Sequence, residues 1–126
     1  MNVVDSSAWL EYFGGGQNAE EFAEVIESPD ELVVPSLTLF EVFKRISQIA
    51  DETAALEAAA VMLSGRLAEL TATLAMDAAR LSIDAGLAMA DSIILATARA
   101  EGATLWTQDA HFAGLPDVEY REKPAT

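Results

Sequence analysis

The stretch LAMADSIILATARAEGATLWTQD, residues 87–109, predicts a helix, a turn and a strand in immediate succession. Apolar residues recur at helical spacing up to Gly102, where a glycine is expected to cap the helix C-terminus. The segment ATLWTQD then predicts a strand that ends at Asp109. Asp91 lies inside the apolar run, and burying a carboxylate is costly unless it is paired, hydrogen-bonded or bound to a cation. We therefore expect an α/β unit in which Asp91 has a specific partner.

The same alternation of strand and helix patterns extends over the rest of the chain. Short β-branched runs alternate with longer segments whose apolar residues repeat every three to four positions. This order predicts an α/β fold, a single domain over residues 1–126 with a central, mostly parallel sheet flanked by helices on both faces. The expected strands are 2–5, 31–36, 69–74, 103–109 and a weak one at 118–122; the expected helices are 6–13, 19–28, 36–49, 52–67, 75–86 and 88–102.

Composition narrows the chemistry. The chain has 52% hydrophobic residues but no run of about 18 apolar residues, so no membrane span is expected. The N-terminal segment MNVVDSSAW lacks the pattern of an export signal, which favours a cytoplasmic protein. There is no cysteine and only one histidine, His111, which argues against disulfides and against a thiolate or histidine-based zinc site. Any metal is expected to be held by oxygen ligands.

The net charge of −14 comes from 7 basic and 21 acidic residues. It argues against broad nonspecific attraction to nucleic acid or to an anionic membrane, although a local basic rim remains compatible with it. For most of these carboxylates a solvated surface is the simpler interpretation. A basic partner or several cations is the more specific alternative.

Four acids stand in apolar surroundings: Asp5, Glu41, Asp91 and Asp109. Asp5 and Asp109 follow expected strands, and the carboxyl ends of parallel strands form the crevice where α/β sheets bind ligands. If the four converge, their repulsion raises some pKa values unless a divalent cation lies between them. Oxygen ligands suit Mg²⁺ or Mn²⁺. For any one acid alone, a helix cap or a solvated turn remains the alternative interpretation.

The residues around these acids resemble the PIN-domain ribonucleases, in particular the VapC-type toxins of toxin–antitoxin pairs. Asp5 lies in VVDSSAWLEYF, Glu41 in LTLFEVFKR, and Asp91 and Asp109 in the stretch quoted above, which HFAGLPDVE follows after Ala110. The most specific part is an acidic residue five positions before ATA, followed by a strand and T-x-D-x-x-F. The resemblance extends from the first strand to about residue 120.

The resemblance implies a PIN-like fold and a Mg²⁺- or Mn²⁺-dependent endoribonuclease whose acidic pocket is formed by Asp5, Glu41, Asp91 and Asp109. Asp5, Asp91 and Asp109 are the expected metal ligands, direct or through water, and Glu41 is expected to orient a water. The metal is expected to acidify that water and to neutralise charge on the phosphate. The resemblance also implies a cognate antitoxin, bound in a groove beside the N-terminal helices, and a homodimer.

Several neighbouring residues are candidates for supporting roles. Ser6 and Thr107 lie beside two of the acids, and each is expected either to hydrogen-bond a ligand carboxylate or to act as a helix cap or strand-end hydroxyl. Lys44, Arg45 and Arg99 are candidate phosphate contacts, with surface salt bridges as the favoured alternative.

His111 and five aromatic residues have simpler structural interpretations. His111 is expected to cap the turn after Asp109, because a metal mechanism needs no histidine base, and contact with the substrate is the alternative. The aromatic residues are expected to be mostly core, with the antitoxin groove beside them. They are Trp9, Tyr12, Phe13, Phe40 and Phe43.

Three other functions were weighed against the nuclease. A haloacid-dehalogenase-like phosphatase needs a D-x-D pair, but Ser6 and Ser7 follow Asp5. A receiver domain needs an acidic pair after the first strand and a lysine after a late one, where this chain has Thr107, Gln108 and Asp109. A catalytically silent PIN-like binding module remains open, because residues alone do not prove turnover.

Overall fold

A computed structural model describes residues 1–124. Five strands form one sheet in the order β3-β2-β1-β4-β5, and every neighbouring pair is parallel. The prediction of an α/β fold with a mostly parallel sheet is therefore confirmed. Residues 125 and 126 of the predicted single domain, 1–126, lie outside the described part. The strands are β1 (Asn2–Val4), β2 (Leu32–Pro35), β3 (Arg66–Ala68), β4 (Thr104–Thr107) and β5 (Val118–Tyr120).

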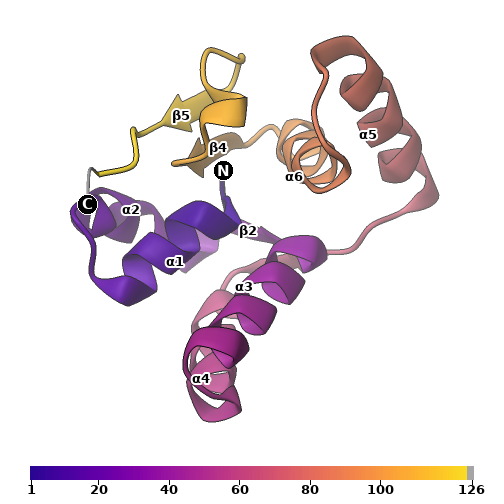
Figure 1. The fold of residues 1–126 in the computed structure, drawn as a ribbon. Helices are drawn as coiled ribbons and strands as arrows, with labels where there is room; N and C mark the ends of the chain where they lie inside the picture. Colours follow the sequence, from indigo (N-terminus) through magenta and orange to yellow (C-terminus); the bar gives the residue numbers. More distant parts are fainter. Residues whose placement is uncertain (125–126) are drawn as a thin grey trace.

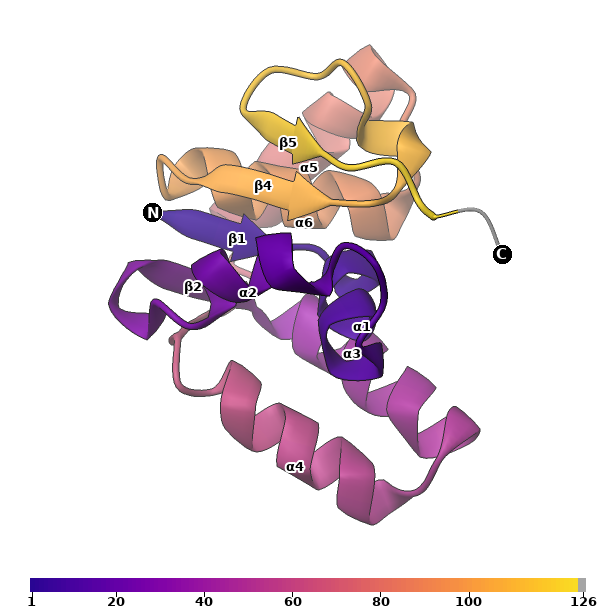
Figure 2. The ribbon, with the colours of Figure 1, turned by 90° about the vertical axis from the view of Figure 1, so that its left-hand side faces the viewer.

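Helices cover both faces of the sheet (Figure 1). In the views of Figures 1 and 2, α1 and α2 lie on one side of the strands, α5 and α6 lie on the other, and α3 and α4 form a hairpin that extends away from the sheet. The α-helices are α1 (Ser6–Gly14), α2 (Ala19–Ile26), α3 (Ser36–Ile49), α4 (Glu52–Met62), α5 (Ala72–Ala85) and α6 (Met89–Ala100); the 3₁₀ helices are η1 (Pro29–Glu31) and η2 (Ala110–Phe112).

The short strands are buried on both faces, so successive side chains enter two different cores. Val4 packs into a cluster with Trp9 of α1, whereas its neighbour Val3 packs into a cluster with Ile94 of α6. Val3 and Val4 are both fully buried. This double burial explains why the strands are continuous runs of β-branched residues, as is typical of parallel sheets.

The direction in which the chain builds the sheet reverses at β1. From β1 the chain adds β2 and β3 on one side, and then returns to add β4 and β5 on the other. Figure 2 shows β1 and β4 side by side and pointing the same way. In parallel α/β sheets such a reversal opens a crevice beyond the carboxyl ends of the two strands. Asp5 follows β1, and Asp109 lies two residues beyond β4.

Two of the expected elements are wrong. The helix expected over 52–67 ends at Met62, and the strand expected over 69–74 is instead β3, which begins at Arg66 and pairs with β2. Residues 72–74 form the first turn of α5, three residues before the expected start, because the Thr71 hydroxyl accepts the backbone N–H of Leu74 at 3.2 Å. Threonine favours strands by its branching, but it also caps helices, and here the capping role prevails.

Gly65 allows a close approach of the chain to β2. A Cβ atom at this position would lie 2.9 Å from the Leu32 carbonyl oxygen. Because only glycine lacks that atom, the chain can turn here and enter β3 directly beside β2.

The expectation that the N-terminal aromatic residues are mostly core has one clear exception. Trp9 is fully buried, whereas the Phe40 side chain on α3 is 59% exposed. Phe40 therefore belongs to the surface of the chain as described.

Within residues 1–124, no single helix is long and apolar enough to cross a membrane. Only α5 and α6 taken together, bent by 115° at the break between them, meet the length and composition expected of a span.

Candidate metal centre

Asp5 is held at the carboxyl end of β1 by two hydroxyl groups. Its Oδ2 atom accepts hydrogen bonds from Ser7 Oγ at 2.7 Å and from Thr107 Oγ1 at 2.9 Å. Asp5 is only 3% exposed, and burial raises the pKa of its carboxyl above the usual value, while the two hydroxyls partly lower it. Oδ1 accepts neither hydroxyl, and the backbone N–H of Ser6 also hydrogen-bonds the carboxyl and lowers its pKa.

The same hydroxyls fix the chain after β4. Ser7 Oγ accepts the backbone N–H of Gln108 at 3.0 Å, and Thr107 Oγ1 accepts that of Asp109 at 2.9 Å. Each hydroxyl therefore donates to Asp5 and accepts from the segment that carries Asp109. We refer to this arrangement of Ser7 and Thr107 as the hydroxyl clamp.

The hydroxyl clamp confirms the hydrogen bond predicted from Thr107 to a site carboxylate, and Ser6 forms such a bond with Glu41 rather than with Asp5. The serine that bonds the Asp5 side chain is Ser7, because α1 begins at Ser6 and its first turn directs the next residue toward Thr107. The Ser6 hydroxyl instead lowers the pKa of Glu41.

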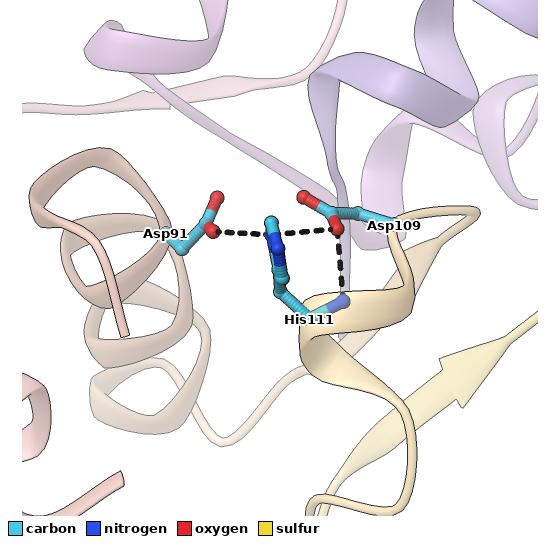
Figure 3. A group of neighbouring side chains, drawn as sticks. All are labelled: Asp91, Asp109 and His111. Atoms are coloured by element: carbon cyan, nitrogen blue, oxygen red, sulfur yellow. Dashed lines mark hydrogen bonds and ion pairs between the residues drawn. The ribbon is translucent and has the colours of Figure 1, made fainter. Parts of the chain in front are cut away.

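Asp91 and Asp109 approach each other across His111 (Figure 3). His111 Nδ1 lies 3.1 Å from Asp109 Oδ1 and 3.6 Å from Asp91 Oδ2. One ligand atom from each of the three residues falls within a single 4.8 Å group. Contrary to expectation, the capping residue is Asp109, whose Oδ1 accepts the backbone N–H of His111 at 2.9 Å at the start of η2.

The electrostatics of Asp91 reflect this crowding. Asp91 lies in the first turn of α6, and its side chain is 17% exposed. Burial, and then repulsion from Asp109 and Asp5, raise the pKa of Asp91 from 3.8 to about 6, and His111 opposes the rise. The partner that the sequence required for Asp91 is therefore a group of carboxylates and one imidazole, with a deficit of positive charge.

Glu41 reaches the same place from α3. Burial raises the pKa of Glu41, and charges on Asp5, Asp91 and Asp109 raise it further. Its Oε1 atom is buried and has no hydrogen-bond partner within residues 1–124. The structure thus brings all four predicted acids, from four different segments, within mutual electrostatic influence.

The donor set fits a divalent cation. A buried carboxylate oxygen without a partner is costly, and so is a group of acids whose ionised forms repel one another. A cation bound among these oxygens relieves both costs. Carboxylate oxygens suit Mg²⁺ or Mn²⁺, and Nδ1 of His111 is a further ligand that Mn²⁺ in particular accepts.

The three predicted phosphate contacts have other surroundings in the structure. The Lys44 ammonium lies 5.8 Å from the ring centroid of Phe40. Arg99 donates to the carbonyl oxygen of Pro116 at 3.3 Å, and Arg45 lines an apolar groove between helices. Within residues 1–124, neither Lys44 nor Arg99 forms the surface salt bridge that was the favoured alternative, and an aromatic ring and a backbone carbonyl are their neighbours instead. The sequence did not single out Lys123, which lies beside Asp109 in a separate cavity.

The fold and the site together define a class of protein: a parallel α/β domain with a carboxylate pocket where the strand order reverses. The family model for the PIN domain matches residues 3–118. The chain belongs to the PIN domain family. No curated protein sequence matches the chain significantly.

Solved structures share this fold over nearly the whole chain. A toxin–antitoxin complex from Klebsiella pneumoniae matches with a TM-score of 0.83 and 23% identity, covering 98% of this chain and 100% of that one. The sarcin–ricin loop cleaving toxin VapC20 of Mycobacterium tuberculosis matches with a TM-score of 0.78 and 22% identity, over 96% and 99% of the two chains. VapBC2 from Rickettsia felis, bound to a promoter DNA fragment, matches with a TM-score of 0.71 and 17% identity, over 96% and 97%.

Proposed function

We propose that the chain is a Mg²⁺- or Mn²⁺-dependent endoribonuclease toxin of the VapC type. The observation that carries the proposal is the convergence of Asp5, Glu41, Asp91 and Asp109 beyond the ends of β1 and β4, where the pKa values of the first three are raised. A surface cluster of acids has no need to be buried beside hydroxyls that orient it. The family and the fold of the VapC structures support the same activity.

The surroundings of the four acids support a different role for Glu41 than for the three aspartates. Asp5, Asp91 and Asp109 are the proposed metal ligands, and the hydroxyl clamp fixes the Asp5 carboxyl through its Oδ2 atom. Glu41 Oε1, which has no other partner in the described chain, is the proposed acceptor that orients the attacking water. The cation, when bound, supplies the positive charge that acidifies this water and stabilises charge on the phosphate. No side chain needs to form a covalent bond to RNA.

Cleavage of RNA tests the proposal directly. Purified protein is incubated with total cellular RNA in the presence of Mg²⁺ or Mn²⁺, with parallel samples containing EDTA. We expect cleavage with metal, none with EDTA, and a loss of at least about 100-fold in Asp91→Asn and Glu41→Gln. Asp84→Asn, the same change at an exposed aspartate of α5, is the matched control and should cleave normally.

The silent binding module is the alternative outcome of the same experiment. Folded, monodisperse protein that cleaves no RNA with either metal, but binds the cation through Asp91, would favour that module. Cleavage that persists in EDTA would refute the metal-dependent mechanism.

We further propose an antitoxin partner that docks between α1, α3 and α4. These helices line an apolar groove of about 580 Å³, which includes Leu10, Phe13 and Ile46. Its lining also carries one residue of each charge, Arg45 and Glu57, so an amphipathic helix is the fitting occupant. The VapBC neighbours, which pair a toxin with an antitoxin, support the existence of such a partner. Loss of antitoxin binding in Ile49→Asp, whose side chain lines the groove and is 61% exposed, with RNA cleavage retained, is the expected result.

A homodimer is proposed on the exposed apolar residues of α3, α5 and α6. Phe40 is 59% exposed, Met89 73% and Ile83 81%. A second copy of the chain is the partner that would cover apolar side chains exposed to this extent. Light scattering should give twice the chain mass for the protein and the single chain mass for Phe40→Asp, if α3 contributes to the contact.

A further inference from the structure

A second cavity adjoins the metal centre on the side of β5. It has a volume of about 480 Å³ and is bordered by Asp109, so it begins where the proposed chemistry takes place. Ser7, Gln108, Tyr120 and Lys123 are among its other lining residues. It differs from the apolar groove between the helices in that polar and aromatic side chains line it, and its size is typical of small-molecule sites.

A hydrogen-bond relay fixes which end of the Gln108 amide is available. Asn18 Nδ2 donates to the backbone carbonyl of Glu122 at 3.0 Å and to Gln108 Oε1 at 2.7 Å. A carbonyl only accepts, so Asn18 must present its nitrogen to Glu122, and Gln108 must in turn present its oxygen to Asn18. Gln108 Nε2 is therefore the free end of the amide.

The Gln108 side chain lines the cavity and is held in place. Gln108 is only 3% exposed, yet its Nε2 has no hydrogen-bond partner within residues 1–124. The backbone N–H of Gln108 is held by Ser7 of the hydroxyl clamp, so the residue has little freedom to turn. The Gln108 side chain lines the cavity, so an acceptor on a ligand held there can provide the partner that Nε2 lacks within residues 1–124.

Resting on the proposed nuclease function, we propose that this cavity is a nucleotide subsite that selects a keto base, uracil or guanine, next to the cleaved phosphate. Gln108 Nε2 donates to the O4 atom of uracil or the O6 atom of guanine, whereas cytosine and adenine carry an amino donor at that position. Tyr120 offers an aromatic face for stacking, and Lys123 offers a positive charge to the adjoining phosphate.

Binding of short RNA to an inactivated protein tests the subsite apart from cleavage. Oligouridine and oligocytidine of equal length are titrated against Asp91→Asn in low salt, with fluorescence anisotropy as the readout. We expect oligouridine to bind about 5- to 10-fold more tightly than oligocytidine. The O4 atom of uracil accepts a hydrogen bond from Gln108 Nε2, whereas the amino group of cytosine places a second donor opposite it. Oligoadenosine should bind in the same range as oligocytidine unless stacking strengthens it.

Two further substitutions in this background separate the roles. Gln108→Glu keeps an oxygen facing Asn18 but replaces the donor by an acceptor, so the preference should reverse toward oligocytidine. Tyr120→Leu should weaken both RNAs about 10-fold and leave their ratio unchanged. Gln17→Glu, the same change in an exposed residue of the α1–α2 loop, is the matched control and should preserve the ratio.

The outcomes distinguish this subsite from the proposed nuclease. Equal affinity for the two RNAs, or a ratio that Gln108→Glu leaves unchanged, would overturn the subsite even if the wild-type protein cleaves RNA. Keto-selective binding by a wild-type protein that never cleaves RNA would overturn the nuclease and retain the subsite.

Discussion

Replacing Asp91 by asparagine should make the metal-free protein more stable while it abolishes cleavage. The pKa of Asp91 rises from 3.8 to about 6 in the folded chain, through burial and repulsion from Asp109 and Asp5. Between these two pH values the folded state binds more protons than the unfolded state. Stability therefore falls as the pH rises through this window, and above about pH 6 the full cost of the ionised group is present.

The magnitude follows from the shift. About two pKa units correspond to roughly 3 kcal/mol of unfolding free energy. The Asp91 carboxylate also interacts favourably with the N-terminal end of α6. This interaction contributes about 0.3–1 kcal/mol of unfolding free energy, which the asparagine variant would lose. The net gain of Asp91→Asn is about 2 kcal/mol near neutral pH, or about 5–10 °C in Tm for a chain of this size.

Thermal unfolding followed by circular dichroism in EDTA measures this gain. The difference in Tm between Asp91→Asn and the wild type should be full at about pH 8 and shrink toward zero at about pH 4. The unfolding free energy of Asp84→Asn should stay within about 0.5 kcal/mol of the wild-type value at both pH values. A variant that is no more stable than the wild type at the higher pH would refute the repulsive cluster.

The remaining predictions concern the cation, the hydroxyl clamp and the approach of β3 to β2. Saturating Mg²⁺ should raise the Tm of the wild type by at least about 5 °C and leave Asp91→Asn nearly unchanged, as calorimetry will show. Ser7→Ala should cost about 1–3 kcal/mol in urea unfolding, because the buried N–H of Gln108 loses its acceptor. Gly65→Ala should cost about 1–3 kcal/mol by the same measurement, whereas Gly14→Ala, where nothing lies within 4 Å of the added methyl, should be neutral or stabilising. A Gly65→Ala protein as stable as Gly14→Ala would contradict the close approach.

Local patterns predicted most of the fold and the four acids. Asp5 and Asp109 were recognisable because each ends an apolar run, and strand ends in a parallel sheet share one edge. The strand at 66–68 was missed because three residues carry little periodic signal and Thr71 favours two structures. Ser7 was not singled out, because which of two adjacent serines points at Asp5 depends on where the helix begins, and composition does not resolve that.

The hydrogen bonds that orient the Gln108 amide could not be predicted from local patterns. Asn18, Gln108 and Glu122 meet from three segments, and the relay through them depends on which end of each amide faces which neighbour. No spacing along the chain encodes this arrangement, because the partners are separated by 90 and 104 residues. Such contacts become visible only after the sheet has placed β4 and β5.

The hydroxyl clamp also dictates when the site can exist during synthesis. Ser7 and Thr107 meet across 100 positions of the chain, and β1 receives its second neighbour only when β4 is available. A ribosome must therefore release residue 109 from its exit tunnel before Asp5, Asp91 and Asp109 can come together. The unfinished chain therefore carries an unassembled pocket, and the complete acidic site exists only after the last strands have emerged.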